Sequence, residues 1–151
     1  MSSLSPVQRR AIDQAKEKLV VAAEQLLKDA GVAPSRDFGH SQLRNLVAVA
    51  TETESPAVVL NFIRYQMGRD DKQKNWAQGR EGQRLGERFI AALNDGGGVV
   101  AQVLENPELK GNSLTTQLVR MELIRYFLGF ATRYMKYLEL QAGLVRKGGA
   151  R

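Results

Sequence analysis

The stretch that decides the fold is SLTTQLVRMELIRYFLGFATRYMKYLELQAG, residues 113–143. It contains two glycines and no proline, and its apolar residues recur at steps of three, four or seven. This is the spacing of one face of an α-helix. A helix of about 30 residues is roughly 45 Å long at 1.5 Å per residue, so the rest of this small chain must pack along it.

Most of this helix is expected to be buried, and one narrow stripe is left outside. The apolar positions form a surface that at least two other segments must cover: Leu118, Met121, Leu123, Phe127, Leu128, Phe130, Ala131, Tyr134, Met135 and Tyr137. The remaining stripe carries Glu122, Arg125, Gly129, Thr132, Arg133, Lys136, Glu139 and Gly143. We expect the stripe to face solvent or a partner.

Shorter helices precede the long one. The sequence Ser-Pro-Val-Gln at residues 5–8 predicts a capping box with proline at the first helical position, and Gly31 can end that helix. Ser41 can cap a second helix, and the Ser-Pro pair at residues 55–56 a third. Further helical segments are expected at residues 85–93 and 99–104.

The predicted fold is all-α, because no stretch alternates as a β-strand does and no internal repeat is visible. We expect a single domain over residues 1–151, a bundle of about five helices with a long C-terminal helix. Residues 1–4 and 146–151 are expected to be flexible ends, and residues 70–80 a mobile connector that becomes ordered against a partner. Its one large apolar residue, Trp76, either fills the core, the commoner place for tryptophan, or stacks on a base.

Composition excludes several classes of protein. The chain has no cysteine and one histidine, which excludes disulfides, thiolate metal sites and cysteine nucleophiles. We interpret that histidine, His40, as a surface loop residue. No nucleophile, base and orienting residue form a recognisable set, so we expect a protein that is not an enzyme and needs no metal or cofactor. No signal peptide or run of 18 apolar residues is present, and a cytoplasmic location without membrane contact is expected.

Positive charge is concentrated in two parts of the chain. The net charge is +6, and residues 110–151 hold eight basic and two acidic side chains. Residues 64–88 hold seven basic and four acidic ones. Such clustering is expected if one side of the fold meets a polyanion. A basic, well-solvated surface without a partner explains the charge equally well.

Eight basic residues are candidates for contacts with an anion: Arg44, Arg64, Arg69, Arg80, Arg84, Arg125, Arg133 and Lys136. Arg44 falls in the first turn of the second helix, where a cation opposes the helix dipole. If a helix begins near Arg80, the side chains of Arg80, Arg84 and Arg88 lie on one face. Arg69 follows the third helix and could instead satisfy its last carbonyls. For the others an exposed, solvated position is the alternative.

Four segments resemble a known family. They are HSQLRNLVAVA at 40–50, VVLNFIRYQMGRD at 58–70, RLGERFIAAL at 84–93 and ELIRYFLGFATRYMKYLEL at 122–140. Together they are similar to the small subunit of type III-A CRISPR-Cas effector complexes, the Csm type. The resemblance covers roughly residues 36–141 and implies an all-helical fold of similar length.

The resemblance also implies a role without catalysis in antiviral defence. Copies of such a subunit stack beside the larger subunits of the complex and contact the backbones of the guide RNA and target RNA. By position in the matched motifs, the residues carried over as RNA contacts are Arg44, Arg64, Arg69, Arg133 and Lys136. The other candidates, Arg80, Arg84 and Arg125, rest on charge alone.

Two other classes of protein stay open. The chain could be a helical adaptor whose basic stripe binds an acidic protein. It could also be a helix-turn-helix regulator of DNA, since the second and third helices are short and adjacent. Against the latter, only Asn61 and Arg64 point outward from the third helix, which is few for a helix that reads bases.

Overall fold

The computed structural model describes residues 4–70 and 73–144. Within them lie six α-helices: α1 (Pro6–Ala30), α2 (His40–Thr51), α3 (Pro56–Arg69), α4 (Leu85–Leu93), α5 (Val99–Val103) and α6 (Ser113–Gln141). Two short 3-10 turns, η1 (Asn75–Ala77) and η2 (Pro107–Leu109), lie between them, and the described residues form no strand. The predicted all-α, single-domain bundle with a long C-terminal helix is therefore confirmed.

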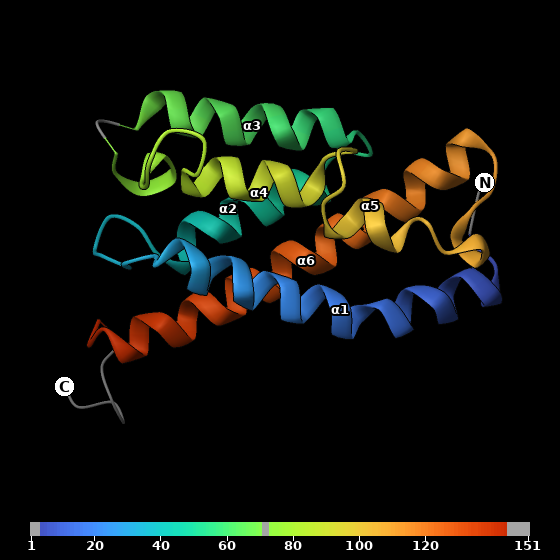
Figure 1. Cartoon of the computed structure of the whole chain (residues 1–151), viewed down its shortest axis with the longest axis horizontal. Helices are drawn as coiled ribbons and strands as arrows, with labels where there is room; N and C mark the ends of the chain where they lie inside the picture. The colour runs from blue at the N-terminus through green and yellow to red at the C-terminus, as the bar shows by residue number, and fades with distance from the viewer. Residues whose placement is uncertain (1–3, 71–72, 145–151) are drawn as a thin grey trace.

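The long helix α6 runs diagonally through the molecule, and the other helices pack around it (Figure 1). Helix α1 lies beside α6 and runs in the same direction. Two contacts show this: the ammonium of Lys16 lies over the ring of Tyr126, and further along both helices that of Lys28 lies over the ring of Tyr134. Helix α2 packs against the other side of α6, and α3 covers α2. Helix α4 pairs with α3, and α5 joins α4 to α1.

A row of four aromatic side chains runs through the core. The rings of Phe38, Trp76, Phe89 and Phe127 meet edge to face in that order, with centroids 5.4, 5.5 and 6.1 Å apart. This geometry is favourable for aromatic pairs, and all four rings are buried. Trp76 is 2% exposed, so its assignment to the core is confirmed and the alternative, stacking on a base, is wrong.

The predicted connector is anchored to this core. The backbone N–H of Trp76 donates to Oδ2 of Asp70 over 2.8 Å, and the N–H of Leu85 donates to the carbonyl of Gln78 over 2.9 Å. Residues 71–72, 1–3 and 145–151 lie outside the described part of the chain. Leu4, expected in the flexible N-terminal end, packs against the core. That residues 70–80 are mobile stays a prediction.

Most helix boundaries follow from local chemistry. The capping box of α1 is present, with Ser5 and Gln8 exchanging hydrogen bonds of 2.9 and 3.1 Å, and Gly31 ends the helix in the left-handed region. One predicted cap is shifted along the chain. Helix α2 begins at His40, ahead of Ser41, and Asn112 caps α6 by accepting the N–H of Thr115.

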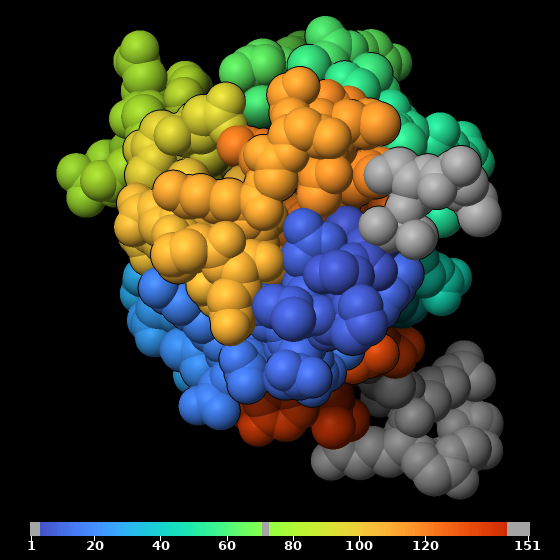
Figure 2. Space-filling model, turned by 90° about the vertical axis from the view of Figure 1, so that its right-hand side faces the viewer, coloured from blue at the N-terminus to red at the C-terminus, as the bar shows by residue number. Residues whose placement is uncertain are grey.

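Different helix ends lie at the two ends of the molecule. In Figure 1 the start of α2, the start of α4 and the ends of α1, α3 and α6 lie at the left. Figure 2 shows the opposite end, where the first turns of α1 meet α5 and the beginning of α6. Several candidate residues belong to the helix ends at the left.

Candidate nucleic-acid interface

The start of α2 is bound to the end of α6 through His40 and Glu139. The backbone N–H of His40 donates to Oε2 of Glu139 over 2.5 Å, and Nδ1 of the imidazole lies 3.0 Å from Oε1 and 2.9 Å from Oε2. The first amides of a helix have no partner within it, so a carboxylate there supplies an acceptor and complements the helix dipole. Glu139 is thereby buried and His40 half-buried. The predicted places of His40 in a surface loop and of Glu139 on the outer stripe are wrong.

Gly39 leaves the space for this contact. A Cβ atom built on Gly39 would overlap Oε2 of Glu139 and lie 3.0 Å from its Cδ. Burial by itself raises the pKa of Glu139. The hydrogen bonds from the backbone and side chain of His40, with the electrostatic attraction of His40 and Lys136, outweigh it and lower the pKa below its ordinary 4.5. The carboxylate therefore stays charged at neutral pH.

The contact between His40 and Glu139 brings three candidate residues to one side. Arg44 lies one turn after His40, and Lys136 lies one turn before Glu139, so both share the side of their helices that makes the contact. Arg133 lies a further turn along α6. The Nζ atom of Lys136 is 3.9 Å from Oε1 of Glu139, and all three cationic side chains are exposed. We call Arg44, Arg133 and Lys136 the basic edge.

Arg125 has a structural task in this fold. Its Nε donates to the carbonyl of Ala50 and one terminal nitrogen to the carbonyl of Thr53, both over 2.8 Å. The guanidinium also pairs with Glu54 at 3.2 Å and Glu122 at 3.5 Å. Its side chain is 23% exposed, and its donors are engaged in closing the C-terminal end of α2. The expectation that Arg125 lines an outward edge with Arg133 and Lys136 is therefore wrong.

The predicted row of three arginines does not form. Helix α4 begins at Leu85, and Arg80 lies in the turn before it. Arg84 is the residue before the helix, and its guanidinium pairs with Glu87 at 3.5 Å. The Nε of Arg88 donates to the carbonyl of Gln83 over 3.1 Å. A helix from Arg80 is replaced by turns because Gly79 and Gly82 take positive φ angles, of 108° and 85°.

The two candidates on α3 are exposed and belong to the other layer of the bundle. Arg64 points away from the buried side of α3, as predicted. Arg69 ends the helix, and its guanidinium carbon lies 6.0 Å from the ring centroid of Tyr65. Arg64 and Arg69 therefore lie on α3, whereas the basic edge lies on α2 and α6, the two helices that the contact between His40 and Glu139 joins.

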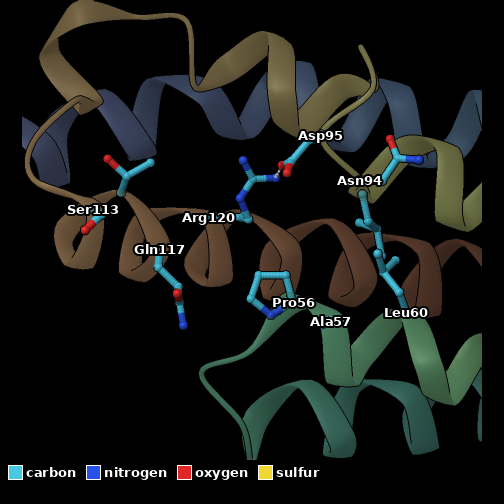
Figure 3. A pocket seen from close by; sticks show the side chains of 10 residues that line it. Pro56, Ala57, Leu60, Asn94, Asp95, Ser113, Gln117 and Arg120 are labelled. Atoms are coloured by element: carbon cyan, nitrogen blue, oxygen red, sulfur yellow. Dashed lines mark ion pairs between the residues drawn. The ribbon is translucent and has the colours of Figure 1, made fainter.

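A separate hollow of about 500 Å³ lies between α3, the end of α4 and the start of α6 (Figure 3). Pro56, Ala57 and Leu60 form an apolar wall, and Arg120 reaches from α6 to an ion pair with Asp95 in the loop after α4. The side chain of Asp95 is 82% exposed, whereas that of Arg120 is 18% exposed. This ion pair holds the loop against α6, and the carboxylate of Asp95 balances the positive charge of Arg120.

Among the described residues, no helix is long and apolar enough to cross a membrane. The same part of the chain holds no group of three or more histidine, aspartate or glutamate side chains that could bind a metal ion.

The fold and site together define a small helical bundle with an exposed basic edge. Comparison of the chain with models of protein families, with curated proteins and with solved structures finds no match.

Proposed function

We propose that the protein is a non-catalytic, cytoplasmic RNA-binding subunit, and that it serves in a type III-A CRISPR effector complex. The observation that carries RNA binding is the basic edge, where Arg44, Arg133 and Lys136 are exposed on two adjoining helices. The assignment to this complex rests on the resemblance of four sequence segments. In that role, copies of the chain stack along the complex and contact the guide and target strands for antiviral defence.

The chemistry of the basic edge suits a backbone contact. Lysine and arginine bound to phosphates release counterions, which gives affinity that is independent of sequence. A subunit that serves any guide must bind without reading bases, and contacts of arginine and lysine to phosphates meet that requirement. The pairing of Lys136 with Glu139 is long, at 3.9 Å, so the ammonium is free to turn to a phosphate.

The test is the salt dependence of RNA binding by the full chain. We expect weak binding to a single-stranded RNA of mixed sequence, measured by fluorescence anisotropy over a series of salt concentrations. The slope of log K against log salt is negative, and each of Arg133→Ala and Lys136→Ala should reduce its magnitude by about 0.7. Arg10→Ala removes an exposed cation from the first turns of α1, at the opposite end of the molecule, and should leave the slope unchanged.

Unchanged slopes for both edge variants, with helical circular dichroism intact, would remove the basic edge from the RNA site. Tight binding to one duplex DNA sequence would favour the helix-turn-helix alternative. The complex itself is tested by tagging the chain in cells that carry a type III-A system, where guide RNA should co-purify with it.

A further inference from the structure

A hollow between the C-terminal halves of α1 and α6 has the composition of a nucleotide site. Its volume is about 440 Å³, and it is lined by Val20, Glu24, Phe130, Arg133, Tyr134 and Tyr137. Arg133 belongs both to this hollow and to the basic edge. A ligand held by Arg133 at the basic edge therefore lies next to the hollow.

Aromatic side chains form one wall. Tyr137 is 49% exposed, although its place on the helix predicted a buried ring. The ring centroids of Tyr134 and Tyr137 are 5.8 Å apart with their planes tilted by 40°, and the hydroxyl of Tyr137 accepts a hydrogen bond of 2.9 Å from Gln141. Phe130 and Tyr134 are half-buried, and Val20 faces them from α1. The opening is thus bordered by an exposed tyrosine ring whose hydroxyl is bound to Gln141.

Cations surround the rings. The guanidinium carbon of Arg133 lies 5.9 Å from the ring centroid of Phe130, and the ammonium of Lys28 lies 5.7 Å from that of Tyr134. Both cations are exposed. Glu24 is the acidic residue in the lining, and its carboxylate offers an acceptor to an N–H at the edge of a base.

We propose that this hollow binds an unpaired nucleotide, with the base against Tyr137 and the phosphate at Arg133 and Lys28. A flat aromatic group joined to an anion is the ligand that satisfies both the rings and the cations. An organic cation would be attracted by one carboxylate, that of Glu24, but repelled by two cations, Arg133 and Lys28. An apolar helix of a partner would bury those two charges, together with Glu24, without a counter-ion, which is costly.

This inference rests on the proposed function, because it concerns the strand that the basic edge holds. It adds a preference that phosphate contacts cannot give: single strands over duplexes, since the bases of a duplex are stacked and paired. Stacking tolerates every base, so the preference carries no sequence code.

The experiment compares Tyr137→Leu with the wild-type chain in binding an oligouridylate, an oligoadenylate and an RNA duplex. Leucine keeps an apolar side chain and removes the ring. We expect the affinity for both single strands to fall about 5- to 150-fold, from the usual contribution of one stacked base, and the affinity for the duplex to stay the same. Tyr137→Phe keeps the ring and should retain the wild-type affinity.

Tyr65→Leu is the matched control. Tyr65 is 58% exposed on α3 and has Arg69 near its ring, as Tyr137 has Arg133 one turn away, but it lines none of the hollows described above. Its replacement should change neither affinity. A second measurement uses 2-aminopurine within the single strand, whose fluorescence should be quenched by the wild-type chain and not by Tyr137→Leu.

Equal single-strand affinities of Tyr137→Leu and wild type, with no difference in 2-aminopurine quenching, would overturn the nucleotide site. The basic edge is judged separately by the salt slopes of Arg133→Ala and Lys136→Ala. If those slopes fall while Tyr137→Leu binds normally, the proposed function stands and this inference fails. A chain that binds no RNA at all overturns both.

Discussion

Glu139 and Arg125, fourteen residues apart on α6, bind the two ends of α2. Glu139 accepts the first backbone N–H of α2, that of His40, and Arg125 donates to the carbonyl of Ala50 near its last turn. Twelve residues of helix span about 18 Å and fourteen about 21 Å, so the two side chains match the length of α2. The carboxylate is at the positive end of the α2 dipole and the guanidinium at the negative end, and both interactions are favourable.

Replacing Glu139 by glutamine should destabilise the protein in a manner that depends on pH. At neutral pH we expect a loss of about 1–3 kcal/mol in the free energy of unfolding, because a charged acceptor of two hydrogen bonds is removed. The pKa of Glu139 is lowered by folding, so its contribution is complete above the ordinary pKa of 4.5 and is lost as the pH falls through the lower, folded value.

Urea titrations from neutral pH downward check this prediction. The difference between wild type and Glu139→Gln should be largest at neutral pH and should shrink once the pH falls below 4.5. Glu17→Gln, on the exposed side of α1, is the control and should change little at any pH. A difference that stays constant as the pH falls would contradict the assignment of the charge to this contact.

Arg125 and Lys136 should respond oppositely in two assays, although both are cations on α6. Arg125→Ala leaves two carbonyls of the α2 end without their donor, and we expect a loss of about 1–3 kcal/mol in stability with no change in the RNA salt slope. Lys136→Ala should change stability by less than about 0.5 kcal/mol and should lower the slope. A stability loss for Lys136→Ala as large as that for Arg125→Ala would contradict this division of tasks.

Two glycine-to-alanine replacements should have opposite signs. Gly39→Ala forces a methyl group into the carboxylate of Glu139, and overpacking of this kind costs about 1–3 kcal/mol. Gly129 lies within α6 with no neighbouring atom within 4 Å of a new Cβ, so Gly129→Ala should stabilise by about 0.5–1 kcal/mol through helix propensity. Thermal unfolding followed by circular dichroism at the helix band measures both changes in stability. A Gly39→Ala variant that is more stable than wild type would contradict the close contact between Gly39 and Glu139.

Trp76 should report the integrity of the core. It is the one tryptophan of the chain and is 2% exposed, so its emission should be blue-shifted in the folded state and shift to the red in urea. Iodide should quench it poorly before unfolding, and added RNA should leave it unchanged. Trp76→Ala should cost about 3–5 kcal/mol, the usual range for removing such a ring. Strong quenching by RNA in the folded chain would show that the ring is accessible after all.

Helices were the part of this molecule that the sequence predicted best. Periodicity and caps act locally, so the capping box at Ser5 and the termination at Gly31 could be recognised without a structure. The shift at the start of α2 has a physical cause. Helix α2 is capped by Glu139, a residue 99 positions from His40, and no local pattern contains that partner.

The candidate site was predicted less well, because exposure depends on which helices meet. A helical wheel placed Arg125 and Glu139 on an outward stripe, yet both face α2 and are occupied there. It placed Tyr137 on the buried surface, although α1 leaves nearly half of that side chain uncovered. The spacing of four between Arg133 and Tyr137 was the one available signal, since residues so spaced share a face.

The parallel pairing of α1 with α6 sets the order in which this fold can form. Lys16 and Tyr126, which touch across that pair, are separated by 110 positions, so the two helices meet only after most of the chain has been synthesised. Until then α1 lacks α6, the helix against which most of its apolar side packs. Contacts this distant slow folding, and chaperone binding during translation is the expected consequence.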